Sequence, residues 1–323
     1  MDASDSSSSL PVNPPTDLTR VIETLRTKYW SWILRSQTDG PTRLLDLLKE
    51  RMPHICATSW QERFDFGGIY VNGLEALSDM ELPLPSKVEY YEPKFDIGSA
   101  HAQFAPFKDD YILFHDDAIA IVYKPPHLSS MPAKEQRHFS LKAALEKHFS
   151  RTVHMPSRLD VSAQGLVVIS ISPAAHAGLQ RAFETRTVHK TYRYASHVRS
   201  PWHEKLVDFN IAVSPEHPVL RVASTSEGQT AQTRFAYSHS STSEETPVHV
   251  YTANPITGRT HQIRVHAAAS GLSLVGDNFY GGIRATYLHL VSCALMLPHP
   301  TTGATVEISL PPSLSPSWVS PSR

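Results

Sequence analysis

Apolar residues in the first hundred positions follow a helical period and then a strand period. Those from Leu18 to Leu34 recur at i, i+3 and i+4, which predicts one amphipathic helix. The Asn72-Gly73 pair then marks a hairpin-type turn. This mixture predicts a small α+β unit. Its other predicted elements are helices over 44–51 and in the first half of 59–73, and strands over 69–71 and 87–93.

Residues 94–109 show no clear period, and strand patterns dominate after them. Helices are predicted between the strands, and Ser140 and Ser172 stand where helix N-caps are expected. Strands and helices do not alternate strictly, which favours an α+β fold over a doubly wound parallel sheet. The predicted helices cover 141–149, 173–183 and 261–270, and the predicted strands cover 111–114, 118–123, 166–171, 191–198, 230–237, 249–252 and 305–310.

The composition of the chain excludes several classes of protein. No run of 18 apolar residues is present, so no transmembrane helix is expected. Only Cys56 and Cys293 are present, which excludes a disulfide scaffold and a cysteine-rich zinc module. The first 17 residues are polar and acidic and lack the features of a targeting signal, so we expect a cytoplasmic protein. The net charge of −1 gives no global attraction to nucleic acid, so a polyanion site must be a local patch.

Two segments carry polar groups beside predicted strands. Arg158-Leu159-Asp160 comes shortly before an apolar strand, at an element end where catalytic groups are often placed. Asp160 could be a nucleophile or general base, or it could form a loop salt bridge with Arg158. Lys190 and Tyr192 alternate on a strand and therefore point to one face. Taken alone, they could equally be ordinary strand residues.

A third segment, 256–271, concentrates basic residues near the start of a predicted helix. His261 and Arg264 share a helix face, and Arg259 precedes them. Such a cluster could bind phosphate, hold a carboxylate in its ionised form, or form a solvated basic helix. His261 and His266 are five residues apart and not on one face, so we expect no metal site. Lys124 ends an apolar strand and could be a surface lysine or the rim of a site.

Together these segments resemble the RluA-type family of RNA pseudouridine synthases over roughly residues 110 to 311. The nine residues from Gly258 to His266 are the most specific part of the resemblance. The full set occurs in the family's order, which makes a chance match improbable. Its members are Lys124-Pro125, Arg158-Leu159-Asp160, Gly165, Lys190-x-Tyr192, Gly258–His266, Gly276-Asp277, Tyr280-Gly281, Leu288-His289 and His299-Pro300.

The resemblance implies an activity and a role for each matching residue. It implies isomerisation of uridine to pseudouridine in a structured RNA, ribosomal or transfer, without a cofactor. Asp160 matches the catalytic aspartate, Tyr192 the tyrosine that stacks on the target base, and Arg264 the arginine that pairs with the aspartate. Arg158 matches the arginine that helps displace the neighbours of the flipped nucleotide. The remaining predicted RNA- or substrate-binding residues are Lys124, Lys190, Arg259 and His261.

The resemblance also implies a mixed, mainly antiparallel sheet with flanking helices and a central basic cleft. The expected organisation is a disordered tail over 1–17, an N-terminal α+β unit over 18–97 that could bind RNA, a catalytic domain over 98–311 and a C-terminal tail over 312–323. We expect a monomer that binds RNA and no membrane.

Departures from the family pattern surround the aspartate. Ser157 replaces a histidine, Val161 replaces a basic residue, and Ala163-Gln164 replaces Thr-Ser. These positions affect how the loop meets RNA more than they affect the chemistry. A catalytically silent RNA-binding protein on the same fold remains an alternative. A hydrolase that uses Asp160 with a histidine is another, but it leaves the Gly258–His266 match unexplained.

Overall fold

The structure is a computed structural model that describes residues 18–93, 107–242 and 246–321. The predicted N-terminal tail lies outside the described residues. Within these ranges the chain groups into two compact units. The larger unit comprises 18–25, 109–126, 154–242 and 246–321, and the smaller unit comprises 26–93, 107–108 and 127–153.

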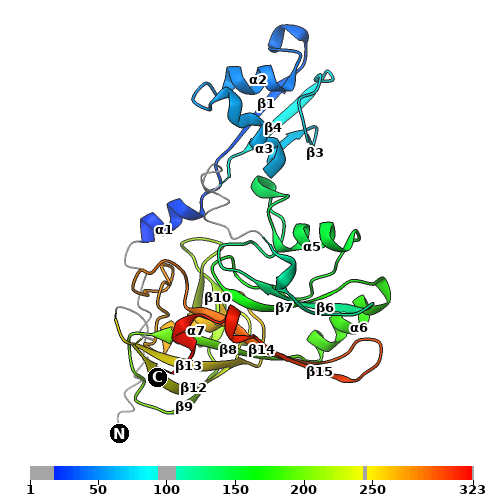
Figure 1. Cartoon of the computed structure of the whole chain (residues 1–323). Coiled ribbons are helices and arrows are strands. Elements are labelled where there is room, and N and C mark those ends of the chain that lie inside the picture. The colour runs from blue at the N-terminus through cyan, green and yellow to red at the C-terminus, as the bar shows by residue number, and fades with distance from the viewer. Residues whose placement is uncertain (1–17, 94–106, 243–245, 322–323) are drawn as a thin grey trace. The chain divides into compact units, whose positions relative to one another are not determined.

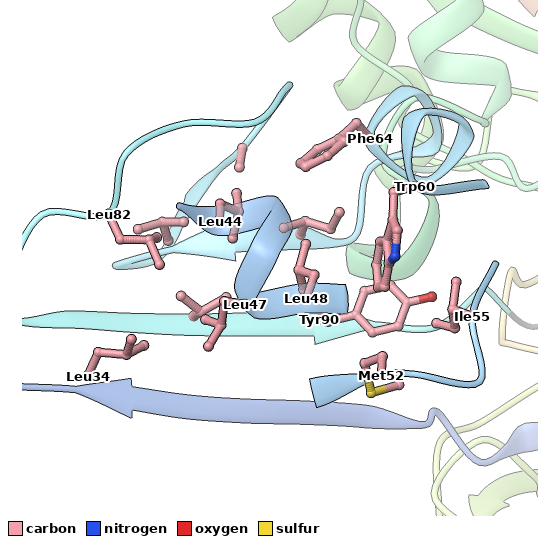
Figure 2. Close-up of a cluster of buried hydrophobic side chains, with 14 residues drawn as sticks. Leu34, Leu44, Leu47, Leu48, Met52, Ile55, Trp60, Phe64, Leu82 and Tyr90 are labelled. Carbon is pink, nitrogen blue, oxygen red and sulfur yellow. The ribbon is translucent and has the colours of Figure 1, made fainter. Parts of the chain in front are cut away.

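The smaller unit is built on a four-stranded antiparallel sheet in the order β1-β4-β2-β3. Leucines of α2 and aromatic side chains of α3 and β4 form its buried core, as Figure 2 shows. Leu44, Leu47 and Leu48 are fully buried because their helical spacing places them on one face. The elements are β1 (Tyr29–Leu34), α2 (Leu44–Arg51), α3 (Trp60–Phe66), β2 (Ile69–Val71), β3 (Leu74–Glu75), β4 (Ser86–Tyr91) and α5 (Leu141–Phe149).

The predicted single helix over Leu18–Leu34 is wrong in its second half. Helix α1 spans only Leu18–Leu25, and β1 follows. Strand β1 pairs with β4, and its Trp30 and Trp32 pack against the core of the unit. Aromatic residues fit a pleated, half-buried surface well, so strand pairing prevails over the helical spacing here.

The larger unit contains a nine-stranded sheet in the order β5-β6-β7-β14-β8-β13-β12-β9, with β15 also paired to β14 (Figure 1). Strands β14 and β7 run parallel, and every other pair of named strands in the described residues is antiparallel. This arrangement confirms the mixed, mainly antiparallel α+β fold. The strands are β5 (Ile112–His115), β6 (Ile119–Lys124), β7 (Gln164–Ser170), β8 (His189–Ser196), β9 (Glu204–Val207), β12 (Thr233–Ser241), β13 (Val248–Pro255), β14 (Leu290–Pro298) and β15 (Thr305–Ser309).

Besides the segment 18–25, which is helical, two further α-helices and a small two-stranded sheet belong to the larger unit. Helix α6 spans Pro173–Glu184, and α7 spans Gln262–Ala269. Strands β10 (Asn210–Val213) and β11 (Arg221–Ser224) pair with each other, and α7 packs near β11, β12 and β13. In the C-terminal segment, Trp318 is fully buried and stacks on His289. Among the described residues, no helix has the length and apolar composition needed to cross a bilayer.

A glycine allows β7 to approach β14 closely, directly after the turn that carries Asp160. Gly165 has φ +112°, and a Cβ atom added there would lie 2.2 Å from the carbonyl oxygen of Ser292 on β14. A side chain at this position would push the two strands apart. Gly165 therefore fixes where the polar turn meets the sheet.

Candidate active site

Asp160 lies in the turn that leads into β7. The amide of Ala163 donates to the backbone carbonyl of Asp160 at 3.1 Å, which closes the turn. The Asp160 side chain is about a quarter exposed, with a relative accessibility of 25%. It is therefore the carboxylate of this site that an outside molecule can reach.

Arg264 comes from α7 and joins two carboxylates. Its Nη1 donates to Oδ2 of Asp160 at 3.1 Å. Its Nε and Nη2 donate to the two oxygens of Asp277, each at 2.8 Å. Arg264 is only 4% exposed, and the Asp277 side chain is completely buried. The fork of the guanidinium thus fixes Asp277 through two parallel bonds and leaves a third donor for Asp160.

The opposite charges in this cluster favour the ionised form of each group. Burial opposes ionisation of Asp160, but the neighbouring His261 ring and the Arg264 guanidinium keep its pKa below the usual value. Burial also works against the charge on Arg264, but Asp277 and Asp160 raise its pKa. Asp160 is therefore a carboxylate, and not a neutral acid, at neutral pH.

The start of α7 is held by one buried amide side chain. Oε1 of Gln262 accepts hydrogen bonds from the Thr257 hydroxyl at 2.7 Å and from the Arg259 amide at 3.0 Å. Its Nε2 donates to the Gln232 carbonyl and to the Thr233 hydroxyl, each at 2.9 Å. These four bonds satisfy the buried amide and fix the turn before α7, so Arg264 enters the site from a rigid element.

Tyr192 and Lys190 lie on β8, two residues apart and on one side of the strand. Tyr192 is 7% exposed, and burial together with the negative charge of Asp160 raises the pKa of its phenol. Lys190 Nζ donates to the Ser157 hydroxyl at 2.7 Å and lies 4.8 Å from the centre of the Phe183 ring. Burial lowers the pKa of Lys190 to about 8. Lys190 therefore ties β8 to the turn that carries Asp160.

Lys124 lies beneath that turn and is not a surface lysine. It ends β6 and is completely buried. Its Nζ donates to the carbonyls of Pro125 at 2.9 Å and Val161 at 3.2 Å. Burial lowers its pKa to about 7, although the nearby Asp160 opposes this shift. Lys124 contacts the backbone of the residue that follows Asp160, so it supports the turn from inside.

Three other predicted residues occupy different surroundings. Arg158 is exposed and has no side-chain partner among the described residues. Arg259 is partly buried, and its Nε donates to the Thr230 carbonyl at 3.1 Å. His261 immediately precedes α7, with its Nε2 3.8 Å from Oδ2 of Asp160. The structure thus brings Asp160, Arg264 and His261 together and leaves Arg158 free for an outside partner.

Two residues of this cluster are not among the predicted site residues. Asp277 belongs to the Gly276-Asp277 pair of the family resemblance, and it is the closest partner of Arg264. Tyr280 packs beside it, with its ring centre 5.0 Å from the Arg264 guanidinium carbon. The available signal was the position of Arg264 among apolar residues of a short helix. A buried arginine needs buried acceptors, and a motif that ends in aspartate could supply one.

The basic residue of α3 has partners within the smaller unit. Arg63, the basic residue of α3, donates to the Tyr90 hydroxyl at 2.9 Å and to Ser59, so it is engaged within its own unit. RNA binding by this unit stays a prediction. Across the described part of the chain, no group of three histidine, cysteine or acidic side chains could hold a metal ion.

Comparisons with known proteins identify the family of this chain. Residues 118–269 match the family model described as RNA pseudouridylate synthase. The dual-specificity RNA pseudouridine synthase RluA of Escherichia coli (strain K12) is 32% identical over 210 residues, which cover 62% of this chain and 92% of the relative. The uncharacterized RNA pseudouridine synthase YjbO of Bacillus subtilis is also 32% identical, over 62% of this chain and 71% of the relative.

A solved structure supports the fold. That of human RNA pseudouridylate synthase domain containing 1 covers 64% of this chain and 85% of its own, with 24% identity and a TM-score of 0.55. The family model and the curated relatives identify the chain as an RNA-modifying isomerase. The chain belongs to the RluA-type family of RNA pseudouridine synthases, which convert uridine to pseudouridine in RNA.

Proposed function

We propose that Asp160 is the catalytic carboxylate of this enzyme and that Arg264 keeps it ionised and in place. The observation that carries the proposal is the chain of contacts from Asp277 through Arg264 to Oδ2 of Asp160. It joins a completely buried carboxylate to one that is reachable from outside. An ion pair of this kind holds a carboxylate in one orientation at neutral pH.

The reaction needs a carboxylate that is ionised and held in a fixed position. The N1–C1′ bond of the uridine breaks, the uracil turns, and a C5–C1′ bond forms. The C5 proton leaves, N1 gains a proton, and no atom is gained or lost overall. A carboxylate beside C1′ can take a ribose proton or stabilise positive charge at that carbon, and both roles need it ionised. Asp160 meets this condition because its pKa is held below the usual value.

Tyr192 and Arg158 serve the RNA in this proposal. Tyr192 stacks on the target base and holds the uracil while it is detached; its phenol stays protonated because burial raises its pKa. The target base must leave its stack to reach the site, which costs a few kcal/mol. Arg158 is exposed and unpartnered among the described residues, so its guanidinium can contact the displaced strand. Lys124 and Lys190 act from within by supporting the turn.

The substrate is a structured RNA, ribosomal or transfer, and the enzyme acts as a monomer in the cytoplasm. The near-neutral chain provides little long-range attraction, so recognition depends on local contacts and on RNA shape. Cys56 and Cys293 are free thiols, which suits a reducing compartment.

Mapping pseudouridines in cells that lack the gene tests this function. Ribosomal and transfer RNA from these cells would be compared after complementation with the wild-type gene or with Asp160→Asn. The proposal predicts one or more pseudouridines that return with the wild-type gene and do not return with Asp160→Asn at equal protein level. Return of the same sites with Asp160→Asn would show that another group does the chemistry. Asp116→Asn, an aspartate outside this cluster, is the matched control and should restore the sites.

A further inference from the structure

The two oxygens of the Asp160 carboxylate have different surroundings. Oδ2 accepts from Nη1 of Arg264 at 3.1 Å, and the ring Nε2 of His261 lies 3.8 Å from the same oxygen. No side chain in the described ranges donates to Oδ1. The carboxylate is therefore held from one side, and its other oxygen is open.

The hydrogen bonds around His261 fix which ring nitrogen carries the proton. Nδ1 of His261 lies 2.6 Å from the hydroxyl of Tyr280. The same hydroxyl accepts a hydrogen bond from the backbone amide of Arg221 at 3.1 Å. The Asp160 carboxylate, which faces Nε2, can only accept, so it favours the neutral ring with its proton on Nε2. Nδ1 then accepts from the Tyr280 hydroxyl, whose oxygen accepts in turn from Arg221.

His261 is also held in a conformation that few residues with a side chain adopt. Its φ is +59°, in the left-handed region, immediately before α7. Such conformations persist where the surrounding structure fixes them, and they concentrate at functional sites. The His261 side chain is 8% exposed, and burial together with Arg264 lowers its pKa to about 4. The ring is therefore a neutral donor across the physiological range.

We propose that His261 is a positioning residue: Tyr280 locks it as the Nε2–H tautomer, and together with Arg264 it holds Oδ2 of Asp160 so that Oδ1 faces the nucleotide. The distance of 3.8 Å exceeds a hydrogen bond, and bonds of this kind often tighten only when the substrate is bound. This inference rests on the proposed role of Asp160. It adds a residue, a tautomer and the choice of the reacting oxygen.

The test compares variants that keep or remove the donor. The probe is transfer and ribosomal RNA labelled with tritium at uridine C5, from cells that lack the gene. His261→Leu removes the donor and should lower the single-turnover rate constant about 100-fold, the loss expected when a reacting group is misplaced. His261→Gln keeps an N–H donor and should stay within about tenfold of wild type. RNA affinity, measured on the same variants, should fall far less than the rate constant, because the His261 side chain is only 8% exposed; an equal fall in both would mean that His261 acts by binding RNA.

The tautomer lock makes a second prediction that a merely structural role does not. Tyr280→Phe should slow the wild-type enzyme about tenfold, because Nδ1 loses the donor that selects the tautomer. The same change should have no effect in the His261→Gln background, since an amide has no tautomer to select. Loss of the Arg221 contact would act equally in both backgrounds, so an equal slowing in both would overturn the inference.

Two further results separate this inference from the proposed function. Wild-type rates in His261→Leu, combined with an inactive Asp160→Asn, would overturn only the role of His261. An active Asp160→Asn would overturn the proposed function itself. The matched control is His266→Gln on the same helix; His266 is completely buried and bonds to Thr233 and to the Phe209 carbonyl. It should lower the melting temperature without lowering the rate constant of the folded enzyme.

Discussion

Replacement of Arg264 by methionine separates what this arginine does for stability from what it does for catalysis. Arg264→Met keeps an unbranched apolar side chain on α7 but removes the partner of two carboxylates. Asp160 is a quarter exposed and can be solvated or protonated. Asp277 is completely buried and loses both of its guanidinium bonds. The main cost therefore comes from Asp277 and not from the carboxylate that reacts.

Removal of one partner of a buried ion pair costs about 3–5 kcal/mol, because the other charge is left uncompensated. At about 2–4 °C per kcal/mol for a unit of this size, the melting temperature should fall by about 6–20 °C. The double variant Arg264→Met/Asp277→Leu removes both charges and should recover most of this loss, since replacing a buried pair by apolar side chains is often neutral. Neither variant should isomerise uridine, because Asp160 has lost its donor.

Thermal unfolding and tritium release on the same samples would measure both effects. A single variant with an unchanged melting temperature would show that Arg264 does not compensate Asp277 as the distances imply. A double variant that recovers activity along with stability would show that Arg264 is not needed to hold Asp160. Either result would refute the reasoning about the chain of contacts from Asp277 to Asp160.

Three further predictions concern the surroundings of the turn. Burial lowers the pKa of Lys124 to about 7, against about 10.4 in an unfolded chain. Between these pH values the unfolded state binds more protons, so wild-type stability rises with pH there. The melting temperature of the wild type minus that of Lys124→Met should therefore increase from pH 7 to pH 10, and a constant difference would contradict this. Arg158→Ala should leave the melting temperature unchanged, but it should reduce the slope of log affinity against log salt by about 1, and an unchanged slope would remove Arg158 from the RNA contact. Ser157→Ala and Lys190→Met should each slow turnover. The double variant should be no slower than Lys190→Met, because both changes remove the same hydrogen bond. Additive losses would mean that the two residues act separately.

Much of the fold could be predicted from local patterns. The expected ranges of α2 and α5 match the structure, and all nine predicted strands lie at or within a few residues of observed ones. Strand β14, at the centre of the large sheet, was not predicted. Its apolar run from Leu290 is interrupted by Ser292 and Cys293, and its first three residues are all buried, so no alternation marks the start of the strand. Its position becomes clear only from its pairing with β7 and β8.

The candidate site, too, could be predicted from the sequence only in part. The contact between Asp160 and Arg264 could be predicted because both stand in an ordered motif set, whereas the catalytic roles of Asp160, Tyr192 and Arg264 stay predictions. The partner of Arg264 could not, because Asp277 lies 13 positions away on a loop whose path is set by the fold. Nor could the sequence show that Lys124 is buried beneath the turn, since a lysine at a strand end is usually exposed.

The most direct test of the central claim is tritium release from C5-labelled RNA by purified wild-type protein and by Asp160→Asn. We expect release by the wild type only, with equal RNA affinity and equal melting temperature within about 2 °C for both proteins. Release by Asp160→Asn at the wild-type rate would contradict the role of Asp160. RNA binding without release by either protein would favour a catalytically silent RNA-binding protein on this fold.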